Sequence, residues 1–313
     1  MLRNKNIFIA LTYDCCAFCK KCMTRYHQNR KIKMSRETLE RIVKLLKENN
    51  YKGTISVGTG EPLLYPDIEY FIKNILSIND SIKIRLLTNG MLLNNKIPNI
   101  FFDKRIIWGI TLDGFNQETI EEYQKGVNIN IVRKNIENIV KIYGADSIYL
   151  NYTIYQNNID EILPFCEFAV NNNIKEIYFT KLKVFQGYEN RLEKHRIIEN
   201  NDFFSKIDQV KKFLQVNNIS LKGIDIKDEV RNECFKKNLA SPIIDVTGQV
   251  TFCSGKEDIY IGNICDEDIL IKWSKFYKIV NDSNGKWCKN CFDKKLQNGN
   301  YRLPKTIEGD ELL

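Results

Sequence analysis

Proline, histidine and long apolar stretches are scarce in this chain of 313 residues, which has six prolines and two histidines. No apolar run approaches the roughly 18 residues that a membrane-spanning helix needs. The N-terminal apolar stretch 7–11 is too short for a signal peptide, so we expect a cytoplasmic protein without a membrane segment. A content of 43% hydrophobic and 27% charged residues predicts a globular chain with one large domain or with a large and a small one.

Blocks of basic residues with interleaved aromatic residues, which mark many nucleic-acid sites, are also missing. The formal net charge of +8 is modest for this length and is spread along the chain. This pattern favours a solvated basic surface over a nucleic-acid partner. A basic groove that receives an acidic peptide or a phosphorylated substrate is compatible with the same charge.

Cysteine, in contrast, is abundant, and ten cysteines without a secretory signal indicate metal ligands rather than disulfides. Cys15, Cys19 and Cys22 are spaced C-x3-C-x2-C on a loop that directly follows the apolar stretch 7–11. Soft thiolates select zinc or iron-sulfur clusters. Three thiolates are an incomplete set, so one metal position stays open for a ligand that is not protein.

A structural zinc loop is the alternative interpretation of these three cysteines. Zinc would need a fourth protein ligand nearby, and only His27 and Cys16 are close in the sequence. Cys16 is adjacent to Cys15, and in an extended chain neighbouring side chains point in opposite directions. We therefore expect Cys16 to be a spare thiol.

Segments with strand-like and helix-like patterns alternate about six times, which indicates parallel strands covered by helices. Polar turns after the strands place the chemistry at their C-terminal ends. The pattern predicts strands at 7–11, 54–57, 82–87, 106–112, 148–154 and 176–180, and helices at 35–50, 67–76, 131–143, 159–170 and 203–216.

Three polar segments follow successive predicted strands. The first, Gly58-Thr59-Gly60-Glu61-Pro62, is a turn in which small residues let the backbone approach a ligand and Glu61 provides an acceptor for a cation or ammonium group. The others are Thr88-Asn89-Gly90 and Thr111-Leu112-Asp113-Gly114. Each segment alone is compatible with a simple turn, and the polar Asn151 in the strand 148–154 is compatible with a solvated face.

Taken together, in this order and spacing, the cysteine loop and the three strand ends resemble the radical S-adenosylmethionine (SAM) superfamily. The resemblance implies that Cys15, Cys19 and Cys22 hold a 4Fe-4S cluster whose fourth iron binds SAM. It also implies a partial (β/α)6 barrel of the TIM type, in the α/β class. One position departs from the family, because Lys21 stands where an aromatic residue usually precedes the last cysteine.

The resemblance also implies the residues that contact SAM. Gly60, Glu61 and Pro62 match the GGEP motif, which contacts the SAM amino group. The other implied contacts lie at the ends of, or within, later strands of the barrel, and they are Thr88, Asn89, Thr111, Asp113 and Asn151.

A second set of cysteines lies in the C-terminal part, at Cys234, Cys253, Cys288 and Cys291. The segments 243–246 and 250–252 predict a hairpin around Gly248, followed by a helix at 267–280. This arrangement resembles the SPASM/twitch extension and implies one auxiliary 4Fe-4S cluster, with a four-cysteine zinc site as the alternative.

Two further cysteines have other expected roles. Cys166 lies in the apolar phase of its helix and is predicted to be a core residue. Cys265 is an alternative to Cys234 as a ligand of the auxiliary cluster, or a candidate hydrogen-atom donor to substrate.

The sequence thus predicts a barrel over 1–217 and an auxiliary-cluster domain with a tail over 218–313. The resemblance implies an enzyme that cleaves SAM reductively to a 5'-deoxyadenosyl radical, which abstracts a hydrogen atom from substrate. We expect it to mature a ribosomally made peptide by cross-linking or epimerisation, with flavodoxin or ferredoxin as low-potential electron donor. The alternatives are oxidation or epimerisation of a sugar or aminocyclitol, and a zinc-stabilised binding module without catalysis.

Overall fold

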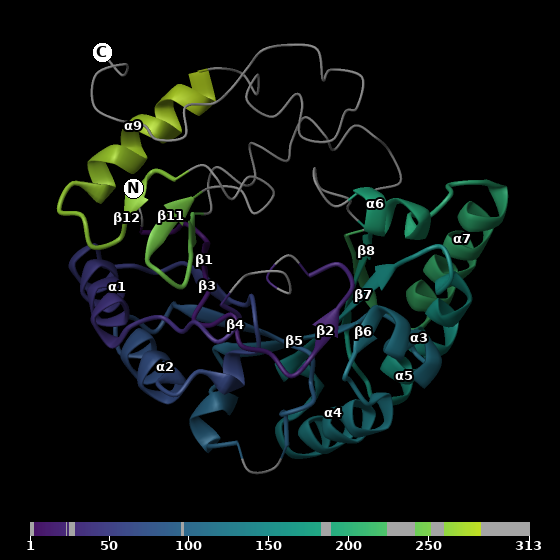
Figure 1. Cartoon of the computed structure of the whole chain (residues 1–313). Helices are drawn as coiled ribbons and strands as arrows, with labels where there is room; N and C mark the ends of the chain where they lie inside the picture. The colour runs from purple at the N-terminus through teal and green to yellow at the C-terminus, as the bar shows by residue number, and fades with distance from the viewer. Residues whose placement is uncertain are drawn as a thin grey trace, which may run out of the picture.

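A computed structural model of the chain describes residues 3–22, 24, 29–94, 97–182, 189–223, 242–251 and 260–282. Within these residues the main feature is a sheet of ten strands in the order β12-β11-β10-β1-β3-β4-β5-β7-β8-β9. The sheet curves into an open arc with helices along its outer side (Figure 1). None of the described helices is long and apolar enough to cross a membrane.

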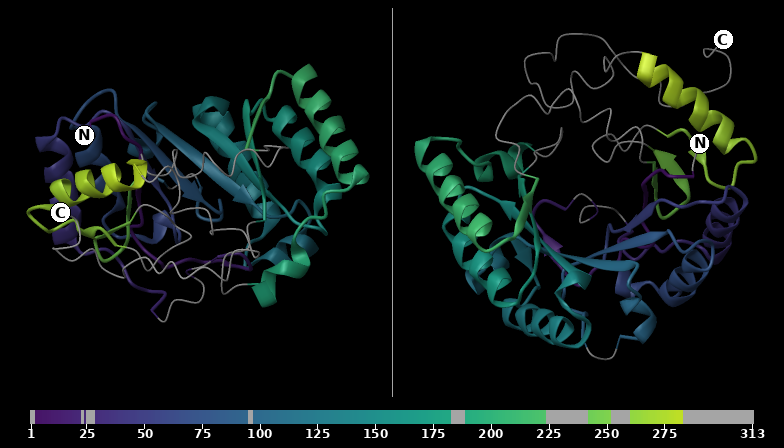
Figure 2. Two further views of the ribbon diagram at one scale, coloured as in Figure 1. Left: turned by 90° about the horizontal axis from the view of Figure 1, so that it is seen from above. Right: turned by 180° about the vertical axis from the view of Figure 1, so that it is seen from behind.

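The centre of the arc is the predicted α/β partial barrel, and all its neighbouring strands are parallel. Its strands are β1 (Ile7–Ile9), β3 (Thr54–Val57), β4 (Lys83–Thr88), β5 (Ile106–Leu112), β7 (Ile148–Ile154) and β8 (Glu176–Lys181). The helices are α1 (Arg36–Glu48), α2 (Ile68–Leu76), α4 (Ile129–Tyr143), α5 (Ile162–Asn171) and α7 (Asn201–Val216). Figure 2 shows from two further sides that these helices cover the convex face.

Local sequence explains where the helices begin and end. The side chain of Ser35 accepts a hydrogen bond from the Thr38 amide and caps α1, within the range predicted for this helix. The side chain of Asn128 caps α4 in the same way, and Gly144 ends that helix with a φ angle of 86°. Such signals lie within a few residues of each helix end and therefore could be recognised in the sequence.

Short elements that the sequence pattern did not predict connect the barrel to its loops. Strand β2 (Phe18–Cys19), in the cysteine loop, pairs antiparallel with β6 (Gln124–Lys125), which directly follows α3 (Gln117–Tyr123). The remaining short elements are η2 (Pro62–Leu64), η3 (Asn99–Phe102), η4 (Ala145–Ser147), η5 (Ile159–Glu161), α6 (Glu189–Leu192), η6 (Glu193–His195) and β9 (Ser220–Lys222).

The C-terminal strands extend the barrel sheet. Strand β10 (Ile243–Ile244) is parallel to β1 and forms the predicted hairpin with β11 (Gln249–Thr251), and β12 (Gly262–Asn263) and α9 (Ile269–Asp282) follow. Strand β9 pairs with β8 at the other edge. The sheet therefore continues across the division that the sequence suggested between residues 217 and 218.

Candidate functional site

The cysteine loop lies between β1 and α1 and is attached to the barrel at two points. Strand β2 carries Cys19 and pairs with β6, which lies much later in the sequence, after α3. The guanidinium of Arg30 donates hydrogen bonds to the carbonyl oxygens of Cys15 and Ala17 at 3.5 and 3.1 Å. It also lies over the ring of Phe18, 4.0 Å from the centroid. These contacts hold the loop without using any cysteine sulfur.

Cys15, Cys19 and Cys22 are free thiols that are partly buried. Burial and the nearby carboxylate of Asp113 raise the pKa of Cys19, so a bound cation would favour its thiolate. Among the described residues, no three His, Cys, Asp or Glu side chains converge on one metal ion.

Cys16 does not point away from Cys15 as expected. The side-chain amide of Asn89 donates to the Cys16 sulfur at 3.3 Å and to the Cys15 sulfur at 3.7 Å. The chain bends at Cys16, so the alternation of an extended segment does not apply. Both sulfurs therefore face the same polar group.

The turn after β3 packs directly against the start of the cysteine loop. Thr59 and Gly60 adopt positive φ angles of 65° and 76°, and a β-carbon on Gly60 would collide with the carbonyl oxygen of Thr12. The amide of Glu61 donates to the carbonyl oxygen of Asp14 at 2.7 Å. The backbone of this turn thus approaches closely, as predicted for its small residues, and what it contacts is the backbone of the cysteine loop.

Glu61 is completely buried at the centre of the site. Its carboxylate accepts hydrogen bonds from the Thr88 hydroxyl at 2.9 Å and from the Asn89 amide at 3.2 Å. Burial raises its pKa to about 7, and no cation among the described residues pairs with it. A buried carboxylate without a counter-ion fits the ammonium group of SAM.

Pro62 is buried beside Glu61 and begins the short helix η2, which Glu61 caps. Asn89 connects the cysteine loop to Glu61. Its side-chain amide donates to the sulfurs of Cys15 and Cys16, and its backbone N–H donates to the Glu61 carboxylate. The structure thus brings the first and second predicted strand ends together around the cysteine loop.

Thr111 and Asn151 face each other on neighbouring strands of the lumen, the concave side of the sheet. They are register partners in β5 and β7, and the Asn151 amide donates to the Thr111 hydroxyl at 3.5 Å. Both side chains are half-buried. A neighbouring hydroxyl and amide on the open face can both bind the hydroxyl groups of a ribose.

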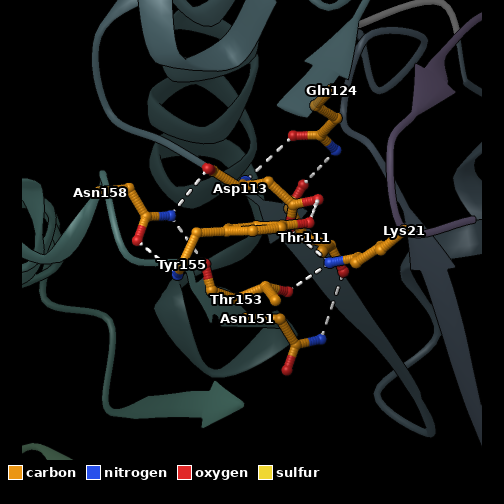
Figure 3. Close-up of polar contacts among 8 residues, drawn as sticks. All are labelled: Lys21, Thr111, Asp113, Gln124, Asn151, Thr153, Tyr155 and Asn158. Carbon is orange, nitrogen blue, oxygen red and sulfur yellow. Dashed lines mark hydrogen bonds and ion pairs between the residues drawn. The ribbon is translucent and has the colours of Figure 1, made fainter. Parts of the chain in front are cut away.

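Asp113 is fully buried and belongs to a polar network that the sequence did not reveal (Figure 3). Lys21 contacts its carboxylate and the Thr153 hydroxyl, and Tyr155 donates to the same carboxylate at 3.2 Å. Asn158 donates to the Asp113 carbonyl at 2.9 Å. The carboxylate of Asp113 therefore faces Lys21 and Tyr155 rather than the open lumen.

Gln124 completes this network by joining it to β6. Its carbonyl accepts from the Asp113 amide at 3.1 Å, and its amide donates to the Thr111 carbonyl at 2.9 Å. The sequence marked Asp113 and Thr111 as a strand end and Lys21 as a departure from the family's usual aromatic residue, but it did not indicate that these residues contact one another. The partners of Lys21 lie 92 and 132 residues away, which explains why the signal could not be interpreted.

The predicted ligands of the auxiliary cluster, Cys234, Cys253, Cys288 and Cys291, lie outside the described residues, as does His27. Cys265 is exposed in the turn between β12 and α9. Cys166 is fully buried in α5, as predicted.

A partial barrel with a three-cysteine loop and a buried carboxylate at its strand ends is the arrangement expected of the SAM-binding iron-sulfur class. The sequence pattern of the radical SAM superfamily matches residues 9–169, just over half of the chain. The chain belongs to this superfamily. It is therefore a radical SAM enzyme, and the family implies SAM and a 4Fe-4S cluster as its cofactors.

Curated relatives by sequence include GTP 3',8-cyclases. The enzyme of Clostridium perfringens is 28% identical over 211 residues, which cover 66% of this chain and 62% of that protein. A probable GTP 3',8-cyclase of Methanococcus aeolicus is 30% identical over 172 residues, covering 52% and 55%. The matched region thus spans less than two thirds of the length of these relatives.

Solved structures confirm the fold. Streptococcus suis SuiB bound to SAM has a TM-score of 0.67 at 16% identity, covering 87% of this chain and 66% of that one. The enzyme anSMEcpe with bound SAM and a peptide has a TM-score of 0.66 at 16% identity, covering 91% and 82%. At such identities the likeness concerns the fold alone.

Proposed function

We propose that Cys15, Cys19 and Cys22 hold the 4Fe-4S cluster and that Glu61 receives the ammonium group of SAM. The observation that carries this assignment is the buried carboxylate of Glu61, which no cation in the described part of the chain pairs with, and whose residue is bound through its backbone amide to the cysteine loop. Thr111 and Asn151 would hold the ribose. When bound and reduced by an external electron donor, the cluster would supply one electron that cleaves the bond between the SAM sulfur and its 5' carbon, giving methionine and a 5'-deoxyadenosyl radical that would take a hydrogen atom from substrate.

The remaining residues would shape and shield this site. Asn89 positions the cysteine loop relative to Glu61, and Arg30 holds the loop backbone. Lys21, which stands where the family usually has an aromatic residue, would hold the buried carboxylate of Asp113 in place.

We infer that the substrate is a ribosomally made peptide, modified by cross-linking or epimerisation. Support comes from two proteins of similar fold, since SuiB was solved with the precursor peptide SuiA and anSMEcpe with a bound peptide. We also propose that the chain beyond residue 217 is a twitch/SPASM-type extension with a 4Fe-4S cluster on Cys234, Cys253, Cys288 and Cys291.

A nucleotide is the second candidate substrate. Support comes from the sequence relatives, several of which are GTP 3',8-cyclases. The peptide proposal and the nucleotide proposal share the SAM chemistry and differ only in what occupies the lumen.

Anaerobic reconstitution followed by iron counting and an assay for 5'-deoxyadenosine tests the proposal. We expect about eight irons per chain and release of the nucleoside with dithionite or reduced flavodoxin. About four irons would remove the auxiliary cluster, and zinc without iron would contradict the whole assignment. Incubation with short peptides and with GTP, read by mass spectrometry, then separates the two substrates.

A further inference from the structure

Four polar side chains form a continuous row across the lumen, which we name the lumen belt: Thr111, Asn151, Tyr178 and Lys222. They are successive register partners on β5, β7, β8 and β9. Partners in neighbouring parallel strands point to the same face of a sheet. The next residues along β7 and β8, Tyr152 and Phe179, are fully buried on the opposite face.

The first half of the belt, Thr111 and Asn151, is the proposed ribose site. The second half has no role in the function described above. There the ammonium of Lys222 pairs with the carboxylate of Glu176 and lies 5.5 Å from the centroid of the Tyr178 ring. The side chains of Lys222 and Glu176 are 44% and 31% exposed, so this end of the belt is accessible.

A second cation faces the same part of the lumen. On β5, Gly109 lies two residues before Thr111 and therefore on the lumen face. Its register partner on β4 is Leu87. Arg85 lies two residues before Leu87, so its side chain points into the lumen as well. Arg85 is half-buried, and within the described parts of the chain its side chain has no hydrogen bond or ion pair. An arginine of this kind, held on a rigid strand, is well suited to bind an anion.

The charges of Arg85 and Lys222 act on the same two side chains, Glu176 and Tyr178. Burial alone would raise the pKa of Glu176, but hydrogen bonds from Lys222 and Tyr178 and the charges of Lys222 and Arg85 lower it. The same two cations also oppose the rise of the Tyr178 pKa that burial and Glu176 cause. Both cations therefore act on the Glu176 carboxylate, and Lys222 is the one that forms an ion pair with it.

Aromatic rings lie on the same face of the sheet as these cations. The rings of Tyr149 and Tyr178 lie 5.1 Å apart and tilted, and a β-carbon on Gly109 would collide with the Tyr149 hydroxyl. Gly109 thus lets the Tyr149 ring lie over β5. The resulting wall combines flat apolar rings with cationic groups, a combination that binds an anionic group attached to an organic body.

We propose that Arg85, Lys222 and Tyr178 form a subsite for an anionic group of the substrate, either a carboxylate or a phosphate. The reacting carbon of the substrate then lies toward Thr111 and Asn151 along the lumen belt. This inference rests on the proposed function, because it assigns the substrate to the face of the sheet that the proposed SAM site occupies.

Anion binding to the reconstituted full chain tests the subsite. The probes are tripolyphosphate for the phosphate arm, tetraglutamate for the carboxylate arm and tetraglutamine as the neutral reference, each titrated by calorimetry. We expect one anionic probe to bind and the neutral one not to bind. Arg85→Met and Lys222→Met should each weaken its binding about tenfold, since each removes a charge-assisted contact.

Lys44→Met is the matched control, because Lys44 is 65% exposed on α1 and pairs only loosely with Glu48 at 3.9 Å. It should bind the probe like the unmodified chain. Arg85→Lys should restore part of the affinity that Arg85→Met loses. Equal binding by the unmodified chain and both methionine variants, or no binding of either anion, would overturn the subsite.

An assay for 5'-deoxyadenosine release by the unmodified chain distinguishes failure of the anion subsite from failure of the proposed SAM chemistry. Nucleoside release without anion binding rejects the subsite alone. Anion binding that depends on Arg85 and Lys222 without nucleoside release supports the subsite and rejects the proposed SAM chemistry.

Discussion

The two faces of the barrel sheet are built from the same strands and differ completely in chemistry. On the convex face the side chains are aliphatic or aromatic and fully buried beneath the helices, including Ile9, Ile55, Ile84, Ile110, Leu150 and Phe179. On the lumen face they are mostly polar and half-buried, including Ser56, Arg85, Thr111, Asn151 and Tyr178. The convex face therefore carries the stability of the fold, and the lumen is available for ligands.

This division has a physical cause. Burial of a large aliphatic side chain contributes about 1.5 to 3 kcal/mol, whereas a buried polar group without a partner is destabilising. A strand that is covered by a helix on one side only can thus place polar residues on the other side at little cost. Substitutions on the two faces should consequently affect different properties.

The largest effect is expected from the cysteine loop. Cys19→Ala should abolish both the 4Fe-4S absorption and the release of 5'-deoxyadenosine, because two thiolates would remain to hold the cube. Cys166→Ala, on the convex side in α5, should keep both signals. Measurement of iron content and nucleoside release checks this, and retention of both by Cys19→Ala would rule out the proposed ligand set.

On the convex face, Ile110→Ala should destabilise the chain by about 2 to 5 kcal/mol, because the Ile110 side chain is fully buried in the core. Denaturant unfolding of the protein without SAM measures the change. SAM affinity under native conditions should stay within about twofold, and a much larger loss would mean that the two faces are not independent.

Glu61→Gln should weaken SAM binding about 10- to 100-fold, since the ammonium group loses its buried counter-charge. In the unmodified protein, affinity should rise from pH 6 to pH 8 as the carboxyl ionises through its pKa of about 7. The variant should show no such dependence. Equilibrium dialysis with SAM at several pH values measures both effects, and a pH-dependent variant would contradict the assignment.

The same carboxyl also affects stability. Its pKa in the folded chain lies above the ordinary value of 4.5, so the folded state binds the proton more tightly than the unfolded state. Without SAM, stability should therefore fall as pH rises from about 4.5 to 7. Glu61→Gln should remove this loss and be more stable at pH 8 by up to about 3 kcal/mol.

The smallest effect is expected in the lumen. Asn151→Ala should change the free energy of unfolding by less than about 1 kcal/mol, because its contact with Thr111 is long and half-exposed. SAM affinity should fall about 3- to 10-fold. Loss of several kcal/mol of stability with unchanged SAM binding would reverse the roles that we assign to the two faces.

Much of the barrel could be predicted because its signals are local. The alternating apolar pattern located the strands, Ser35 marked the start of α1, and Gly248 marked the turn of the C-terminal hairpin, where its φ angle is 84°. The site was predictable to the extent that it lies in short segments. The spacing of the cysteines and the turn at Glu61 are examples.

Contacts between distant segments were not predictable. Lys21 was noticed only as a departure from the family, and nothing near it in sequence indicated that it would reach Asp113 and Thr153. Tyr155, Asn158 and Gln124 were missed for the same reason. Cys16 was misjudged because a bend in the loop turned its sulfur toward Asn89.

By itself the sequence determined the order of strands and helices, the thiol spacing and the position of a carboxyl after β3, because these depend on periodicity and turn chemistry over a few residues. Only the tertiary structure decided which strands are neighbours and which side chains share the lumen. Strand register is set by burial across the whole sheet. A row such as Thr111, Asn151, Tyr178 and Lys222 therefore exists only after the sheet has formed.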